Sequence, residues 1–196
     1  MRTLCYGGSF NPIHLAHLSC SKTAARGKGY ERVLLIPSAV PPHKPDHPDM
    51  PDVSIRLKMC QLAVEDDPFF AISDIEARRT GPSYTIDTVR QLKLEGWDHV
   101  GWLIGADQLV DFPKWKEPLA LMQEADVLVI NRPGAPIDWR ALPGAFRQLE
   151  GNLVEAPLMD ISSTDIRQKI KEGLPIDGLV PEKVARYIED CQLYQS

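Results

Sequence analysis

Short apolar runs alternate along this chain with segments whose apolar residues recur at helical spacing. The runs that are typical of buried strands cover residues 4–6, 33–36, 69–75, 100–104, 127–130 and about 153–155. Helical segments begin near residues 15, 52, 83, 163 and 181. Because strands this apolar need helices over both faces, the alternation predicts an α/β fold, a Rossmann-like doubly wound parallel sheet with helices on both faces. With 196 residues we expect a single domain, 1–196, including a small C-terminal helical part at about 161–196.

Composition places the chain among ordinary globular proteins. It is 43% hydrophobic and 25% charged, with a net charge of -5, which excludes a disordered or fibrous protein and predicts no nucleic-acid partner. No apolar run reaches the roughly 18 residues of a membrane span, and no signal-peptide core follows the first residue. We therefore expect no membrane partner and a cytoplasmic location.

The four cysteines are widely spaced and form no C-x-x-C pair. This spacing argues against a zinc ribbon and against a thioredoxin-type redox site. In a reducing compartment we expect them to be reduced and mostly buried thiols.

The segment GGSFNPIHLAHL, at 7–18, joins the first strand to the first helix. Gly7 and Gly8 have no side chains to obstruct a ligand, so backbone N–H groups there can approach phosphate oxygens beside a helix N-terminus. The segment is neither a G-x-G-x-x-G fingerprint nor a Walker A loop. His14 and His17 are three residues apart and can touch one ligand. A capping or core pair and a metal pair are the alternatives, and the preceding glycines favour phosphate contact.

A second segment, ISSTDIR at 161–167, offers another anion site. Its hydroxyl side chains and its unpaired N–H groups at the start of a helix precede Arg167, which lies one turn into that helix. Taken alone, the segment is more typical of a plain Ser/Thr helix cap, and its position behind the histidine segment reverses this preference.

Together these segments resemble the H-x-G-H and I-S-x-T-x-I-R motifs of the nucleotidyltransferase superfamily, and within it the nicotinate-nucleotide adenylyltransferases. Ala16 stands where this family usually has glycine, and Asn11 where many members have aspartate. Weaker matches fall between the two motifs in family order: PPHK at 41–44, PSYTIDTV at 82–89 and GADQLVDFPKW at 105–115. The resemblance covers residues 3–167.

The resemblance implies an enzyme of NAD biosynthesis that transfers AMP from ATP to nicotinate mononucleotide and releases pyrophosphate. The catalytic residues that it implies are His14, His17, Lys44 and Arg167. The ATP-binding residues that it implies are Gly7, Gly8, Ser9, Phe10, Gly105, Asp107, Ile161, Ser162 and Thr164. The residues implied for nicotinate mononucleotide are Asn11, Thr85, Trp115 and Arg132. Mg²⁺ would enter with ATP, without a metal site built by the protein.

Several alternatives stay open. The histidine motif also fits pantetheine-phosphate adenylyltransferase, and the chain could be a non-catalytic nucleotide-binding module. A metal hydrolase using His14 and His17 is a third possibility. The sequence leaves the oligomeric state open, a homo-oligomer included.

Overall fold

A parallel six-stranded sheet forms the centre of the computed structural model, which describes residues 1–41, 50–131, 136–155, 157 and 159–195. Its strands, in the spatial order β3-β2-β1-β4-β5-β6, are β1 (Arg2–Gly8), β2 (Arg32–Pro37), β3 (Phe70–Ile72), β4 (His99–Gly105), β5 (Asp126–Asn131) and β6 (Leu153–Glu155). The α-helices are α1 (Leu15–Gly27), α2 (Val53–Val64), α3 (Thr85–Leu94), α4 (Ala106–Leu109), α5 (Pro118–Glu124), α6 (Ser163–Lys171) and α7 (Glu182–Asp190). Short 3-10 helices are η1 (Phe112–Lys114), η2 (Trp139–Ala141) and η3 (Gly144–Asn152).

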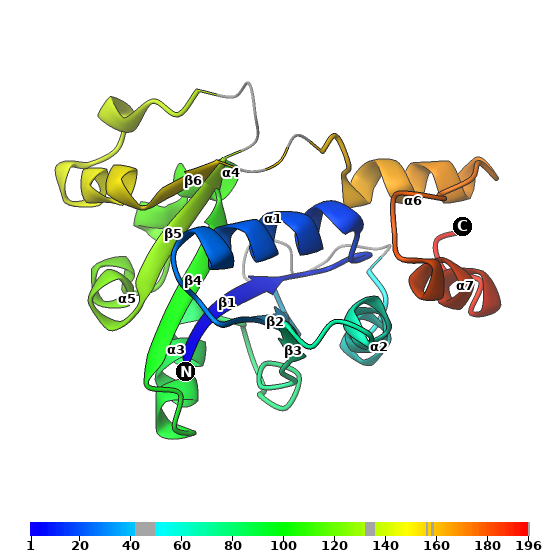
Figure 1. Cartoon of the computed structure of the whole chain (residues 1–196), viewed down its shortest axis with the longest axis horizontal. Helices are drawn as coiled ribbons and strands as arrows, with labels where there is room; N and C mark the ends of the chain where they lie inside the picture. Colours follow the sequence, from blue (N-terminus) through cyan, green and yellow to red (C-terminus); the bar gives the residue numbers. More distant parts are fainter. Residues whose placement is uncertain (42–49, 132–135, 156, 158, 196) are drawn as a thin grey trace.

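The two faces of the sheet carry separate apolar cores, because successive side chains of a strand point to opposite sides. Leu35 of β2 faces the core that contains side chains of α1, α2, α6 and α7. Its neighbours Leu34 and Ile36 face the other core, with side chains of α3 and α5. The two sets of helices lie on opposite sides of the sheet (Figure 1). Each crossover helix thus covers one face, which confirms the doubly wound α/β fold.

Helix boundaries follow local capping. The carboxylate of Asp52 accepts a hydrogen bond from the Ser54 N–H (2.8 Å), and α2 starts directly after Asp52. Strand β3 is shorter than the apolar run 69–75, because the chain turns after Ser73 and the Arg78 N–H donates to the Asp74 carbonyl. The short helices α4 and α5 were not expected from periodicity.

The strand order reverses between β1 and β4. β1 pairs with β2 on one side and with β4 on the other, so the chain leaves the carboxyl ends of these strands toward opposite faces. Open α/β sheets bind ligands in the crevice at such a point. Gly7 and Gly8 end β1 there, and Gly105 ends β4.

The C-terminal helices lie beside α2 and the start of α1 (Figure 1). The Leu15 N–H donates to the Leu179 carbonyl (2.9 Å). The Lys183 ammonium contacts the carboxylates of Glu65 (2.7 Å) and Asp66 (2.8 Å), at the end of α2. These contacts fix the C-terminal part against the first half of the sheet.

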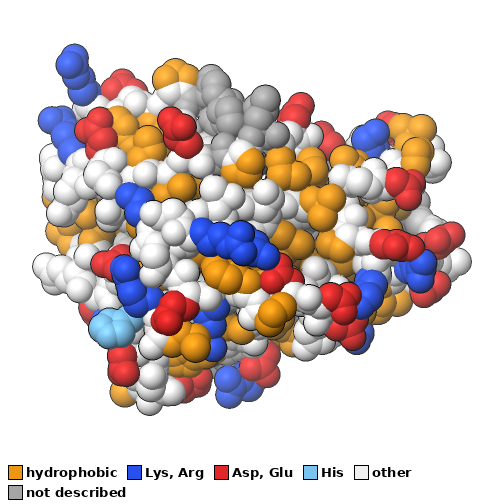
Figure 2. Space-filling view, viewed as in Figure 1, with side chains coloured by type: hydrophobic (Ala, Val, Ile, Leu, Met, Phe, Trp, Pro, Cys, Tyr) orange, Lys and Arg blue, Asp and Glu red, His pale blue; other side chains and the backbone are white. Residues whose placement is uncertain are grey.

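Charged side chains of both signs are interspersed over the face shown in Figure 2. Within the described parts of the chain, no helix is both long and apolar enough to cross a bilayer. None of the four cysteines forms a disulfide, but only two are fully buried: Cys5 and Cys60 lie in the cores, Cys20 is half-buried and Cys191 is exposed. The expectation of mostly buried thiols was therefore wrong for Cys191, which follows the last helix.

Candidate active site

The glycine segment at the end of β1 leaves no room for side chains. A Cβ on Gly7 would lie 2.7 Å from a ring carbon of Trp102, and one on Gly8 would lie 3.3 Å from the Phe10 ring. Phe10 itself has a left-handed backbone (φ 44°), which is uncommon for a bulky residue. It is buried and packs edge-on against Tyr6 and His17. Such strain is typical of functional loops.

The two histidines cap α1 reciprocally. The Nδ1 atom of His14 accepts from the His17 N–H (3.4 Å), and the Nδ1 atom of His17 accepts from the His14 N–H (3.3 Å). Their rings stack with centroids 3.6 Å apart. Because both Nδ1 atoms accept, each neutral ring carries its proton on Nε2. The capping alternative is therefore realised in the structure, and it fixes the orientation of both rings.

The start of α6 docks onto the segment between the glycines and the histidines. The Ser163 hydroxyl donates to the Pro12 carbonyl (2.9 Å), and Arg167 Nη1 donates to the Asn11 carbonyl (2.8 Å). Ser162 is the N-cap, and its hydroxyl accepts from the Asp165 N–H (3.1 Å). The two sequence motifs, far apart in the chain, thus form one site.

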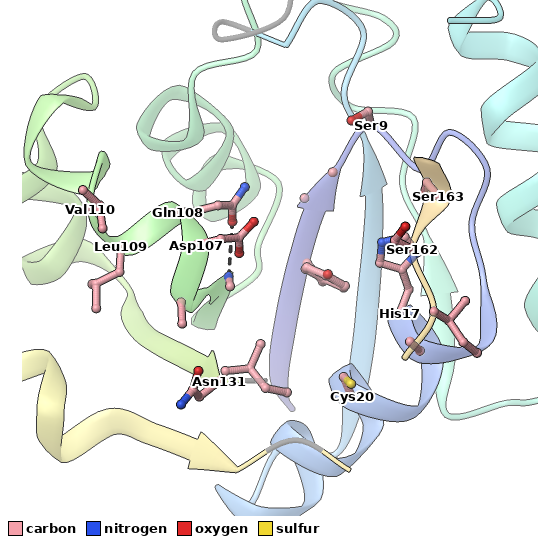
Figure 3. A pocket seen from close by; sticks show the side chains of 18 of the residues that line it. Ser9, His17, Cys20, Asp107, Gln108, Leu109, Val110, Asn131, Ser162 and Ser163 are labelled. Atoms are coloured by element: carbon pink, nitrogen blue, oxygen red, sulfur yellow. Dashed lines mark hydrogen bonds between the residues drawn. The ribbon is translucent and has the colours of Figure 1, made fainter. Parts of the chain in front are cut away.

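A cavity of about 990 Å³ lies at the crevice, near the upper end of the usual size for ligand sites of about 300–1,000 Å³. Asp107 and Gln108 of α4 lie on one side of it, and His17 and Ser162 lie on the other (Figure 3). The expected residues that line it are Gly7, Gly8, Ser9, Phe10, Asn11, His14, His17, Gly105, Asp107, Ile161, Ser162, Thr164 and Arg167. The structure therefore brings together every residue expected for ATP.

A second, smaller cavity of about 180 Å³ adjoins the same glycines. Thr85 and Trp115 line it. Thr85 is the first residue of α3. The side chain of the N-cap residue, Tyr84, makes no hydrogen bond to the N–H groups of the first turn, so these groups offer an anion site. Residues common to both cavities are Gly7, Gly8, Ser9 and Gln108.

Glu76 lines this smaller cavity and is almost completely buried. Burial raises the pKa of its carboxyl, while hydrogen bonds from Thr88 and Ser83 and the charge of Arg79 act in the opposite direction. The Thr88 hydroxyl donates to the carboxylate at 2.7 Å. A carboxylate thus lies close to the helix start that would bind an anion.

Lys116 stands beside Trp115, where some family members carry a second aromatic residue. Its ammonium binds the Asp87 carboxylate (2.8 Å) and lies 5.0 Å from the centre of the Tyr84 ring. Trp115 packs against Phe112, with ring centroids 5.2 Å apart. The indole is therefore held from one side by the core.

Lys44 and Arg132 lie outside the described residues. Asn11, expected to contact nicotinate mononucleotide, lines the larger cavity and not the one with Thr85 and Trp115. Its amide oxygen accepts from the buried Tyr194 hydroxyl (2.7 Å). No group of three His, Cys, Asp or Glu that could hold a metal ion occurs among the described residues.

Sequence reasoning missed several lining residues. Gln108 carried a usable signal, because it follows a buried strand at the carboxyl edge of the sheet. Glu76 carried none, since it precedes two arginines in a stretch typical of an exposed turn. Cys20 and Asp138 also line the cavity, but no sequence motif marks them, because only the folded chain brings them there.

Comparison with known proteins gives consistent matches. The model of the cytidylyltransferase-like family matches residues 5–169. A relative from Roseiflexus sp. (strain RS-1), named "Probable nicotinate-nucleotide adenylyltransferase", is 41% identical over 198 residues, which cover 96% of this chain and 96% of the relative. A relative from Symbiobacterium thermophilum with the same name is 40% identical, over 98% of this chain and 95% of its own.

Solved structures show the same fold. A Plasmodium falciparum nicotinic acid mononucleotide adenylyltransferase complexed with NaAD superposes with a TM-score of 0.76 at 19% identity. The match covers 99% of this chain and 98% of that one.

Proposed function

The chain belongs to the cytidylyltransferase-like family and, within it, to the nicotinate-nucleotide adenylyltransferases, and on this premise we propose that it transfers AMP from ATP to nicotinate mononucleotide. A 5′-phosphate oxygen of the mononucleotide attacks the α-phosphorus of ATP. The bond from the α-phosphorus to the oxygen bridging to the β-phosphorus breaks, and pyrophosphate leaves. The product is nicotinate adenine dinucleotide, an intermediate of NAD biosynthesis.

The observation that carries this proposal is the pair of cavities that share Gly7, Gly8 and Ser9. A reaction that joins two nucleotides needs two sites meeting at one phosphate-binding segment. ATP would occupy the larger cavity, beside the histidines and the start of α6. The pyridine ring would enter the smaller one, with its carboxylate at the start of α3 and its face on Trp115.

No enzyme nucleophile is needed, so catalysis would come from positioning and from stabilising the charge on the leaving pyrophosphate. The Nε2–H groups of His14 and His17 would donate to phosphate oxygens, because their Nδ1 atoms are engaged in the caps. Arg167 and Lys44 would supply further positive charge.

Mg²⁺ would arrive with ATP and neutralise part of the polyphosphate charge. The carboxylates among the described residues that line the larger cavity are Asp107 and Asp138. This donor set suits an ion that keeps phosphate and water ligands rather than one held in a protein cage. We also propose a cytoplasmic location, which agrees with the absence of disulfides among the four cysteines.

Pyrophosphate release with ATP and Mg²⁺ tests the proposal. We expect nicotinate mononucleotide to react at least about tenfold faster than nicotinamide mononucleotide or phosphopantetheine, a difference of about 1.4 kcal/mol. Faster release with phosphopantetheine would instead assign the pantetheine-phosphate reaction. ATP binding without release from any acceptor would identify a binding module.

A further inference from the structure

Arg56 is a fully buried cation that lines neither cavity. It lies on α2, and only 1% of its surface is exposed. Burial lowers its pKa, yet an arginine side chain keeps its proton in proteins. A charge in this position costs free energy unless something compensates it.

Among the described residues, every hydrogen-bond partner of its guanidinium is a backbone carbonyl. Nη1 donates to Ser9 (2.7 Å), Nε to Pro51 (2.9 Å) and Nη2 to Ala39 (3.5 Å). Across the described part of the chain, no carboxylate lies within ion-pair distance of Arg56. Its charge is thus met mainly by carbonyl dipoles, while the Asp52 carboxylate at the start of α2 attracts it from beyond ion-pair distance.

The contact with Ser9 sets the direction of a peptide group in the phosphate-binding segment. The Ser9–Phe10 peptide is trans, so its carbonyl and its N–H point in opposite directions. Arg56, which lines neither cavity, holds the Ser9 carbonyl, so the Phe10 N–H on the other side of this peptide points away from Arg56. Phe10 lines the larger cavity. This N–H has no hydrogen-bond partner among the residues that the structure describes.

The contact with Ala39 extends this support to the other cavity. The Ala39 N–H donates to the Ser83 hydroxyl (3.2 Å), and Ser83 lines the smaller cavity. The Ser38 N–H donates to the Gly8 carbonyl (2.9 Å). One guanidinium therefore supports the segment that both substrates would share.

We propose that Arg56 is a positioning residue of the adenylyl transfer: it holds the Ser9 carbonyl so that the Phe10 N–H faces the polyphosphate, and its positive charge, which no ion pair neutralises, attracts the phosphates of bound substrate. This inference rests on the proposed function. It assigns Arg56 two separable effects, one from its geometry and one from its charge.

Dissociation constants for ATP, ADP, AMP and adenosine, measured by calorimetry, test the charge effect. Arg56→Gln should weaken ATP binding about tenfold, weaken ADP and AMP binding progressively less, and change adenosine binding less than about twofold, since the attraction scales with ligand charge. Arg186→Gln, at an exposed position of α7, is the control with the same change in net charge. It should leave all four constants unchanged.

Arg56→Lys tests the geometric effect, because one ammonium keeps the charge but cannot reproduce the planar fork across three carbonyls. We expect ATP affinity within about threefold of the wild type and kcat for pyrophosphate release lowered about tenfold.

Equal losses for all four ligands in Arg56→Gln, or no loss for ATP, would overturn the role of the charge. Unchanged kcat in Arg56→Lys would overturn the positioning role, and this variant decides the question if Arg56→Gln fails to fold. Wild-type protein that binds ATP but releases no pyrophosphate would contradict the proposed function, while the charge series would still test Arg56.

Discussion

His14 and His17 combine two uses of the imidazole ring. Helix caps are usually Ser, Thr, Asp or Asn, whose side-chain oxygen accepts a hydrogen bond from a backbone N–H of the helix. A histidine cap uses Nδ1 for the helix, and its ring carries a second nitrogen, Nε2, that can donate to a ligand. The alternatives that the sequence left open, capping and phosphate contact, are therefore compatible.

His17→Ala should lower kcat for pyrophosphate release about 10²–10³-fold, the usual effect of losing one preorganised donor to a transition state. The Michaelis constant for ATP should change much less, because the contact strengthens as charge develops on the leaving group.

His17→Gln is the matched control for the cap. Glutamine at the third helical position can still reach back to the His14 N–H, so it should preserve the stability of α1 but lose kcat as the alanine variant does. Wild-type turnover in His17→Gln would show that the imidazole serves only the cap.

Glu76 makes the free energy of unfolding decrease as pH rises, whereas most carboxylates in folded proteins have the opposite effect. Its carboxyl pKa is raised by burial above the ordinary 4.5, so the folded state binds its proton more tightly than the unfolded state does. The stability from this group is complete below 4.5 and is lost as pH rises through the folded pKa. The free energy of unfolding of Glu76→Gln, relative to wild type, should therefore increase between pH 4 and pH 8.

Urea titrations across this range measure the effect. Glu150→Gln, at an exposed position of η3, serves as the control. A difference between Glu76→Gln and wild type that stays constant with pH would contradict the raised pKa.

At the scale of elements, the sequence predicted what periodicity and capping encode. The strands and the longer helices begin within a few residues of their expected positions, because apolar spacing determines which face each one buries. Helix α5 was missed because it starts at Pro118, directly after the left-handed Glu117, in a segment that resembles a loop. Its seven residues are too few for a periodic signal.

We expect helix α6 to act through both its docking onto the histidine segment and the positive charge of Arg167. Arg167→Ala should reduce transition-state stabilisation by about 2–4 kcal/mol, measured as kcat/KM for pyrophosphate release. Ser163→Ala is the control for docking, since it removes the bond to the Pro12 carbonyl and keeps the arginine.

The control variant should lose about 0.5–1.5 kcal/mol of stability and much less of kcat/KM. Equal losses of kcat/KM in both variants would mean that Arg167 acts only by holding α6 against the Asn11 carbonyl.

At the scale of the molecule, the sequence could predict where a ligand site lies, but not that the site consists of two cavities or which residues line each one. The carboxyl ends of parallel strands converge, so the residues after β1 and β4 were expected to meet. Which cavity a residue enters depends on side-chain packing. Asn11, six residues before His17 in the same motif, points its amide to Tyr194 at the far end of the chain. Sequence order carries no sign of that contact.

The separation of the two cavities predicts that their ligands stabilise the protein independently. A ligand at a hundred times its dissociation constant adds about 2.7 kcal/mol to the free energy of unfolding. In Trp115→Ala, ATP should still raise the melting temperature as in wild type, because the indole lines only the smaller cavity. Nicotinate mononucleotide should lose most of its effect.

Thermal melts with each ligand separately measure this, each compared with the variant's own ligand-free melt, since losing the packing on Phe112 lowers the baseline. Trp97→Ala is the matched control: Trp97 packs under the Arg32 guanidinium and lines neither cavity, so both ligand shifts should survive. If Trp115→Ala lost the two shifts equally, Trp115 would support the whole crevice rather than the pyridine site, and the assignment of the smaller cavity would have to rest on α3 alone.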